Sequence, residues 1–336
     1  MIRKLLHLIR WEEWYDSKLP LLAATAYYLA MRHSLPWPDA VARYSLSIVF
    51  CALFLAYGYA VNDYSDLEID KLAGKKKLIA EIPRINTLVL LIALVLLGIV
   101  VLLPYYQDQK VILAVVLCYT LGTAYSLPPI RLKERGIAGL LGSAIAQRSL
   151  PALVIGAVWD SVDIVTLGWA FLGFLVGTRY ILIHQYQDIS ADIKSGVHTF
   201  ATKNPGVIVQ SIRWILMAEI VTAVLLAFSI ILTRIGFLMI PAGYVLYSVW
   251  YYSLYKRFIG VPGLTSFIQV PLADLYTIFL PIGLLLFLSI DDIKWLPFVP
   301  LEILWKRQCA AQYFFLPYRY VIGLWQARVV HRWRRK

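Results

Sequence analysis

Long apolar runs separated by short polar connections fill most of the chain. Nine of these runs have the composition expected of helices in a membrane: Leu19–Met31, Tyr44–Val61, Thr87–Leu103, Val111–Ser126, Ile137–Val158, Ile164–His184, Val207–Leu232, Ile235–Tyr255 and Val270–Ile290. No series of segments alternates with the two-residue period of a strand over enough strands to indicate a β-barrel. The pattern predicts an all-α, polytopic membrane protein with about nine transmembrane helices in a bundle.

Composition supports this interpretation. The 336-residue chain is 60% hydrophobic and 15% charged, with a mean hydropathy of +0.69. A soluble domain is nearer half apolar and a quarter charged. A soluble enzyme, a disordered protein and a coiled coil are therefore excluded as classes.

The connections between the apolar runs differ in their content of Lys and Arg, which predicts their sidedness. One set carries sixteen basic residues, namely Arg3, Lys4, Arg10, Lys18, Lys71, Lys75, Lys76, Lys77, Arg84, Arg131, Lys133, Arg135, Lys194, Lys203, Lys256 and Arg257. The other set carries four, namely Arg32, Arg43, Lys110 and Arg234. The positive-inside rule places the richer set, and the N-terminus, in the cytosol. The net charge of +12 then reflects membrane topology, and we expect no nucleic-acid partner.

The C-terminal tail conflicts with this topology. It carries nine Lys and Arg from Lys294 onward, although nine spans would place it outside the cytosol. Either a broken segment crosses again between Trp295 and Trp325, or one of the nine spans is wrong. The basic, Trp-containing end at 332–336 suits an anionic lipid surface. We therefore divide the chain into a transmembrane domain, 1–292, and a membrane-associated, basic and aromatic-rich extension, 293–336.

An acidic motif follows the second run directly. If the helix continues through it, Asp63, Asp66 and Asp70 are spaced i, i+3 and i+7 and share one face over about 10 Å. Asn62 joins that face four residues before Asp66.

A second acidic motif follows the sixth run, where Asp188 and Asp192 share a helical face at i, i+4. The charge count places both motifs on the cytosolic side, each near a helix C-terminus where anions are unfavourable. A bound cation would offset that cost, and Mg²⁺ suits carboxylate and phosphate oxygens. The alternative is a pair of solvated acidic loops, but two such clusters on one side favour metal. We expect metal ligands at Asn62, Asp63, Asp66, Asp70, Asp188 and Asp192, with the five carboxylates also catalytic.

Basic residues that could meet a diphosphate lie in the loop after the fourth run and inside two spans. Arg131 and Lys133 could clamp the diphosphate charge, although ordinary positive-inside placement would also explain them. Arg148 lies in the middle of the fifth span, where a charge usually faces the bundle interior. Arg179 lies in the sixth span and either pairs with Glu219 of the seventh or contacts substrate.

These elements together resemble the UbiA superfamily of intramembrane prenyltransferases over about residues 15–290. The first motif resembles the family's NDxxDxxxD, the second its DxxxD, and the loop its Tyr-Ser…Arg-x-Lys pattern, through Tyr125, Ser126, Arg131 and Lys133. The second motif is followed by Lys194, Gly196 and Thr199. One departure is the Lys75-Lys76-Lys77 stretch, which stands where many members carry an Asn-x-Arg…Arg-Pro sequence.

The resemblance implies a helical bundle around a central cavity with a cytosolic active-site mouth, Mg²⁺ as cofactor, and a polyprenyl diphosphate donor. The acceptor would be a lipophilic, often aromatic, small molecule. We expect substrate contacts from Asn62, Tyr125, Arg131, Lys133, Lys194, Arg148 and Arg179. A terpene cyclase without a separate acceptor, and a cation transporter from another class, stay open as alternatives. The simplest location is a bacterial inner membrane.

Overall fold

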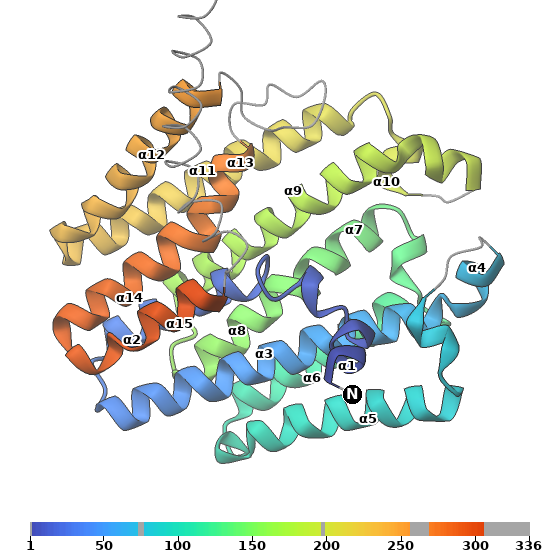
Figure 1. Ribbon diagram of the computed structural model, residues 1–336, viewed down its shortest axis with the longest axis horizontal. Helices are drawn as coiled ribbons and strands as arrows, with labels where there is room; N and C mark the ends of the chain where they lie inside the picture. The colour runs from blue at the N-terminus through green and yellow to red at the C-terminus, as the bar shows by residue number, and fades with distance from the viewer. Residues whose placement is uncertain (1, 73–76, 196–198, 256–268, 306–336) are drawn as a thin grey trace, which may run out of the picture.

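The structure is a computed structural model that describes residues 2–72, 77–195, 199–255 and 269–305. Every regular element in these ranges is helical (Figure 1). The longer helices are α2 (Leu19–His33), α3 (Trp37–Ser65), α5 (Arg84–Val101), α6 (Gln109–Ser126), α9 (Ile164–Ser195), α11 (Ile208–Thr233), α12 (Met239–Tyr255) and α14 (Leu280–Asp291). The shorter α-helices are α1 (Ile2–Leu8), α4 (Leu67–Leu72), α7 (Ile137–Ala144), α8 (Leu150–Val158), α10 (Phe200–Lys203), α13 (Gln269–Asp274) and α15 (Phe298–Trp305).

Two of the predicted spans contain a π-helical turn. In the first, the π-turn η5 (Ile145–Ser149) joins α7 to α8, and in the second, η7 (Leu275–Phe279) joins α13 to α14. A π-turn places an extra residue in the helix and is frequent at functional sites. The turn η5 carries Arg148, which the sequence had singled out.

The all-α prediction is confirmed within the described residues, where each of the nine predicted runs forms helix. Seven helical segments in this part of the chain have the length and apolar composition to cross a membrane. The helix α2, with 15 residues, and the apolar segment Ile235–Trp250 are shorter.

The helix α2 forms the centre of the bundle. Its residues from Leu19 to Met31 are all buried, and it packs against α3, α8 and α14. Large apolar side chains on α5, α6, α11 and α12 instead face outward, among them Leu97, Val116, Leu225 and Leu246. An outward apolar surface of this extent is incompatible with water and suits lipid.

The start of the predicted C-terminal extension packs onto the bundle. The ring of Trp295, 3% exposed, meets the rings of Tyr27 and Tyr44 edge-on at centroid distances of 6.3 and 6.2 Å. Residues 306–336, including the basic end at 332–336, lie outside the described residues, as does most of the stretch from Trp295 to Trp325 in which a further crossing was expected.

Candidate active site

The predicted motifs lie together at one end of the bundle. Four segments lie at the same end of the bundle in Figure 1, namely the C-terminal end of α3, the helix α4, the connection from α6 to α7, and the end of α9 with α10. The two acidic motifs therefore belong to one mouth of the bundle, as their charge context predicts.

The first motif does not continue as one regular helix, contrary to the sequence expectation. The helix α3 ends at Ser65, Asp66 has φ −99° and ψ 1°, and α4 begins at Leu67. The Ser65 carbonyl accepts a hydrogen bond from Arg131 Nη1 at 3.3 Å. This contact from the α6–α7 connection draws the carbonyl toward a side chain and accounts for the break.

The three carboxylates divide into two groups by the cations that they contact. Lys77 Nζ lies 2.7 Å from Asp63 Oδ1 and 2.6 Å from Asp70 Oδ2, so one ammonium bridges the two carboxylates. Arg10 Nη1 reaches Asp63 Oδ1 from the other side at 3.3 Å. Half-burial alone would lower the pKa of Lys77, but its hydrogen bonds to Asp63 and Asp70 outweigh burial and raise it.

The third carboxylate, Asp66, belongs to the second group. Its Oδ1 lies 3.0 Å from Arg131 Nη2 and 2.6 Å from Lys133 Nζ. The same Lys133 ammonium donates to Asn62 Oδ1 at 3.0 Å and to Ser65 Oγ at 2.7 Å. Both loop cations predicted to meet a diphosphate are therefore held at the first acidic motif.

The backbone of the loop that carries these cations has an unusual conformation and packs closely against α7. Arg131 has φ 41°, in the left-handed region that non-glycine residues rarely adopt and that clusters at functional sites. A Cβ on Gly139 would lie 2.6 Å from the Leu132 carbonyl oxygen, so glycine permits this close approach of α7 to the loop.

Burial lowers the pKa of Lys133, although Asp66 acts in the opposite direction. A further anion beside Lys133 would therefore stabilise its charged form.

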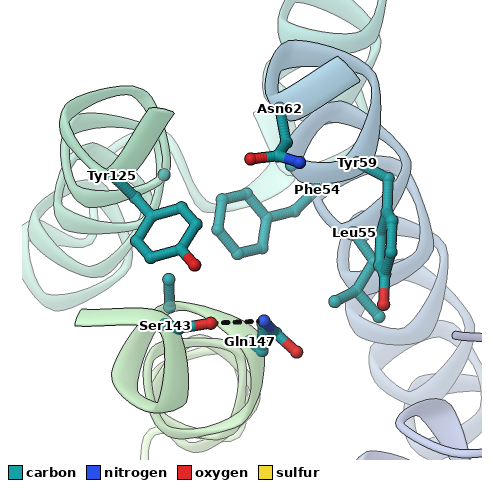
Figure 2. A pocket seen from close by; sticks show the side chains of 10 residues that line it. Phe54, Leu55, Tyr59, Asn62, Tyr125, Ser143 and Gln147 are labelled. Atoms are coloured by element: carbon teal, nitrogen blue, oxygen red, sulfur yellow. Dashed lines mark hydrogen bonds between the residues drawn. The ribbon is translucent and has the colours of Figure 1, made fainter. Parts of the chain in front are cut away.

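A pocket opens next to the first motif (Figure 2). It encloses about 610 Å³, including its open side, between α3, α6 and the α7–η5 segment. The rings of Tyr125 and Phe54 and the amide of Asn62 lie around it, and Gln147 Nε2 donates to Ser143 Oγ at 2.6 Å. Tyr59 also lines it. A largely apolar, aromatic pocket with a few polar groups, next to the charged first motif, can bind an amphipathic molecule.

The second motif lies on the last turns of α9, which extends to Ser195 and so places Asp188 and Asp192 on a helix as predicted. Asp188 is exposed, and Thr199 Oγ1 lies 3.5 Å from Asp192 Oδ2. The capping box of α10, formed by Thr199 and Thr202, fixes the chain next to this motif. Lys194 belongs to α9, and its side chain lies outside the described part.

The two buried arginines have different partners. Arg179 makes two hydrogen bonds to Glu219, with Nε–Oε2 at 2.6 Å and Nη2–Oε1 at 3.0 Å. Of the two alternatives for Arg179, the structure thus contains the pairing with Glu219. Arg148 donates to the Ser17 carbonyl oxygen at 3.1 Å, and its guanidinium lies over the Tyr180 ring at 5.4 Å.

The donor set of the first motif fits Mg²⁺ chemically, because three carboxylates and an amide oxygen are hard ligands. Lys77 places a positive charge between Asp63 and Asp70, and the carboxylates of these two residues are among the groups that would hold a divalent cation. Among the described residues, no group of three or more His, Cys, Asp or Glu side chains lies close enough to hold an ion in this arrangement. In this structure the charges of Lys77, Arg131 and Lys133 instead compensate the carboxylates of the first motif.

The sequence interpretation missed three residues that the structure adds to this region. Arg10 contacts Asp63, Lys18 donates to the Tyr59 hydroxyl, and Ser143 lines the pocket. The sequence signal for Arg10 and Lys18 is their positive charge near the N-terminus, which by itself indicates only membrane topology.

Comparison with known proteins gives an independent result. The model of the UbiA prenyltransferase family matches residues 19–268, which is more than half of the chain. No curated protein matches the chain.

Solved structures share the fold. A UbiA homolog from Archaeoglobus fulgidus bound to DMAPP and Mg²⁺ is 19% identical, with a TM-score of 0.58 over 84% of this chain and 98% of that chain. Its form bound to GPP and Mg²⁺ is 19% identical, with a TM-score of 0.57 over 84% and 99%. A digeranylgeranylglyceryl phosphate synthase is 15% identical, with a TM-score of 0.60 over 84% and 98%.

The apolar helices, the motif-bearing mouth and the family match agree with one another. This chain is an integral, multi-pass membrane protein and belongs to the UbiA prenyltransferase family.

Proposed function

We propose that the protein is a Mg²⁺-dependent intramembrane prenyltransferase. It ionises a polyprenyl diphosphate and transfers the isoprenoid chain to a lipophilic, often aromatic, acceptor. The observation that carries this proposal is the convergence of Asp66, Arg131 and Lys133 with Asn62, which also lines the aromatic pocket. The Archaeoglobus fulgidus homolog, bound to DMAPP or GPP with Mg²⁺, supports the same substrate and cofactor class.

Mg²⁺ would be held by the amide of Asn62 and by the carboxylates of Asp63, Asp66, Asp70, Asp188 and Asp192. When bound, Mg²⁺ neutralises diphosphate oxygens and so favours departure of the leaving group. The cations Arg131 and Lys133 then exchange their contact with Asp66 for the diphosphate. They oppose the negative charge that develops when the allylic carbon–oxygen bond breaks and its electron pair goes to the diphosphate.

The pocket receives the other product of that cleavage, the allylic cation. Its rings, Phe54, Tyr59 and Tyr125, stabilise positive charge through their faces and exclude water, which would otherwise capture the cation. The acceptor's nucleophilic atom then forms the new bond and loses a proton, which the released diphosphate accepts. The proposed substrate contacts also include Lys194, Arg148 and Arg179. Arg179 contacts the substrate while it stays paired with Glu219.

We place the catalytic mouth on the cytosolic side of a bacterial inner membrane, from the distribution of Lys and Arg. The transmembrane domain is assigned to residues 1–292. The extension 293–336 is assigned to the membrane surface.

The test uses purified protein in lipid nanodiscs with Mg²⁺ and prenyl diphosphates of increasing length, with diphosphate release and lipid products measured. We expect release that needs both Mg²⁺ and a lipid or quinone-precursor extract, with a prenylated product. Release without any acceptor, yielding a hydrocarbon or terpene alcohol, would replace transfer by cyclisation. Absence of release under both conditions, with folded protein, would contradict the proposal and favour transport.

A further inference from the structure

A second pocket extends inward from the end of the bundle opposite to the motif-bearing mouth. It encloses about 950 Å³, including its open side, between α9, α11, η6 (Ile235–Leu238), α12 and the segment α13–η7–α14. The end of α11 and the start of α12 lie away from α4 and α10 in Figure 1. Among their described lining residues, this pocket and the one beside Asn62 have neither a residue nor a helix in common. A ligand held here would therefore be separate from the proposed prenyl site.

The second pocket opens toward lipid and has uncharged walls. Its floor includes Trp169, Leu172 and Phe237, all buried, whereas Val224 and Val245 at its rim are exposed. The rim residues belong to α11 and α12, whose outward faces are apolar and suit lipid. Every described lining residue is apolar or aromatic, without a charged side chain. The part of a ligand that enters this pocket is therefore apolar and comes from the bilayer.

Short side chains and a helix that stands apart create the hollow. Ala223 and Ala227 line the pocket from α11, where their i, i+4 spacing places both on one face. The main contacts of α12 in the described part of the chain are with η6 and η7, so the pocket lies between α12 and the α9–α11 side. An empty cavity of this size would leave its walls without packing partners, which destabilises a protein. Molecules of the surrounding bilayer can supply that packing.

The dimensions of the pocket suit one lipid chain. Its lining residues on α11 extend from Ile220 to Ile230, which corresponds to about 15 Å along the helix. The hydrocarbon core of a bilayer is about 30 Å thick, so this length is that of a single leaflet. A hydrocarbon chain of the leaflet opposite to the mouth therefore fits alongside α11.

The indole of Trp169 adds a polar requirement. Its buried Nε1 has no hydrogen-bond partner within the described residues, and an indole nitrogen can only donate. The Tyr276 hydroxyl, at the inner end of the pocket, is instead close to Glu219. Trp169 lies five residues after Ile164, the start of α9, so it is about 7.5 Å from that end of the helix. The ester carbonyls of a glycerolipid lie near this depth, at the boundary of the hydrocarbon, and can accept the hydrogen bond.

We infer that the second pocket binds one glycerolipid molecule of the leaflet opposite to the mouth. One acyl chain fills the hollow beside Ala223 and Ala227, an ester carbonyl accepts a hydrogen bond from Trp169 Nε1, and the head group stays outside the pocket. The lipid completes the packing between α12 and the rest of the bundle. This site goes beyond the proposed function and does not depend on it.

The test measures phosphatidylcholine binding to the full chain in neutral detergent by native mass spectrometry, which counts bound lipids one by one. The probes are a diester phosphatidylcholine with palmitoyl and oleoyl chains, and a diether analogue with chains of the same length that lacks the carbonyls. We expect one diester molecule to bind more tightly than any further lipid, and about three- to tenfold more tightly than the diether. Trp169→Phe should remove this preference, because phenylalanine keeps an apolar ring and lacks the N–H.

A second variant tests the hollow itself. Ala227→Trp fills the space beside α11 and should weaken the first binding step by about tenfold or more. Leu225→Trp is the matched control, because it places the same side chain on the same helix at an exposed residue that does not line the pocket. It should bind the diester as the unmodified protein does. Ala223→Leu/Ala227→Leu repeats the test if Ala227→Trp does not fold.

Three results would each overturn the inference. The first is graded binding of several lipids without one tighter site, and the second is equal affinity in Ala227→Trp and Leu225→Trp. The third is a diester preference that is absent from the unmodified protein or persists in Trp169→Phe. Binding of a prenyl diphosphate analogue at the mouth is measured separately, so failure of the lipid site and failure of the proposed function are distinguishable.

Discussion

Asp63→Asn is expected to lower the rate of Mg²⁺-dependent diphosphate release by about 100- to 1,000-fold. Asp63 is 5% exposed and faces Lys77 and Arg10, so its carboxylate lies where positive charge gathers. The amide keeps the shape of the side chain and removes the charge that a metal ion requires. The measurement is diphosphate release from geranyl diphosphate by protein in nanodiscs, with the thermal midpoint recorded for both forms.

Asp39→Asn is the matched control for this variant. Asp39 lies in the first turn of the same helix, α3, and is exposed. It should retain the activity of the unmodified protein. Full activity in Asp63→Asn, with an unchanged thermal midpoint, would contradict the assignment of the first motif to metal and diphosphate.

Glu219→Leu is expected to lower the free energy of unfolding by about 3–5 kcal/mol. The substitution leaves the Arg179 guanidinium, 1% exposed, without its counter-charge inside the bundle. In the double variant Arg179→Met/Glu219→Leu the uncompensated charge is absent, so most of the stability should return. The measurement is denaturant-induced unfolding in mixed micelles.

This comparison also separates the two roles of Arg179. If the arginine is only structural, the double variant binds the donor analogue as tightly as the unmodified protein does. Weaker binding in a stably folded double variant would support its proposed substrate contact. A Glu219→Leu protein as stable as the unmodified form would contradict the energetic importance of the pair.

The sequence predicted the elements of the fold well because apolar runs of membrane length are determined locally. Each predicted run is helical, and the pairing of Arg179 with Glu219 was one of the two alternatives that the cost of charge at membrane depth left open. Arg131 and Lys133 also lie beside the first acidic motif, as their position after the fourth run suggested.

The local geometry of the first motif could not be predicted in the same way. The helix breaks at Asp66 because Arg131, 65 residues later in the chain, contacts both the Ser65 carbonyl and the Asp66 carboxylate. Such a tertiary contact overrides helical spacing. For the same reason the N-terminal cations Arg10 and Lys18 could be counted from the sequence but not placed beside Asp63 and Tyr59.

The central claim is that this mouth binds a prenyl diphosphate through Mg²⁺. Its most direct test is equilibrium binding of a non-cleavable geranyl diphosphate analogue to the full chain in nanodiscs, with Mg²⁺ and then with EDTA. We expect saturable binding with Mg²⁺ that EDTA weakens at least about tenfold, since diphosphate and carboxylates repel each other without the metal. Equal binding under both conditions, or no binding with Mg²⁺ by folded protein, would contradict the claim.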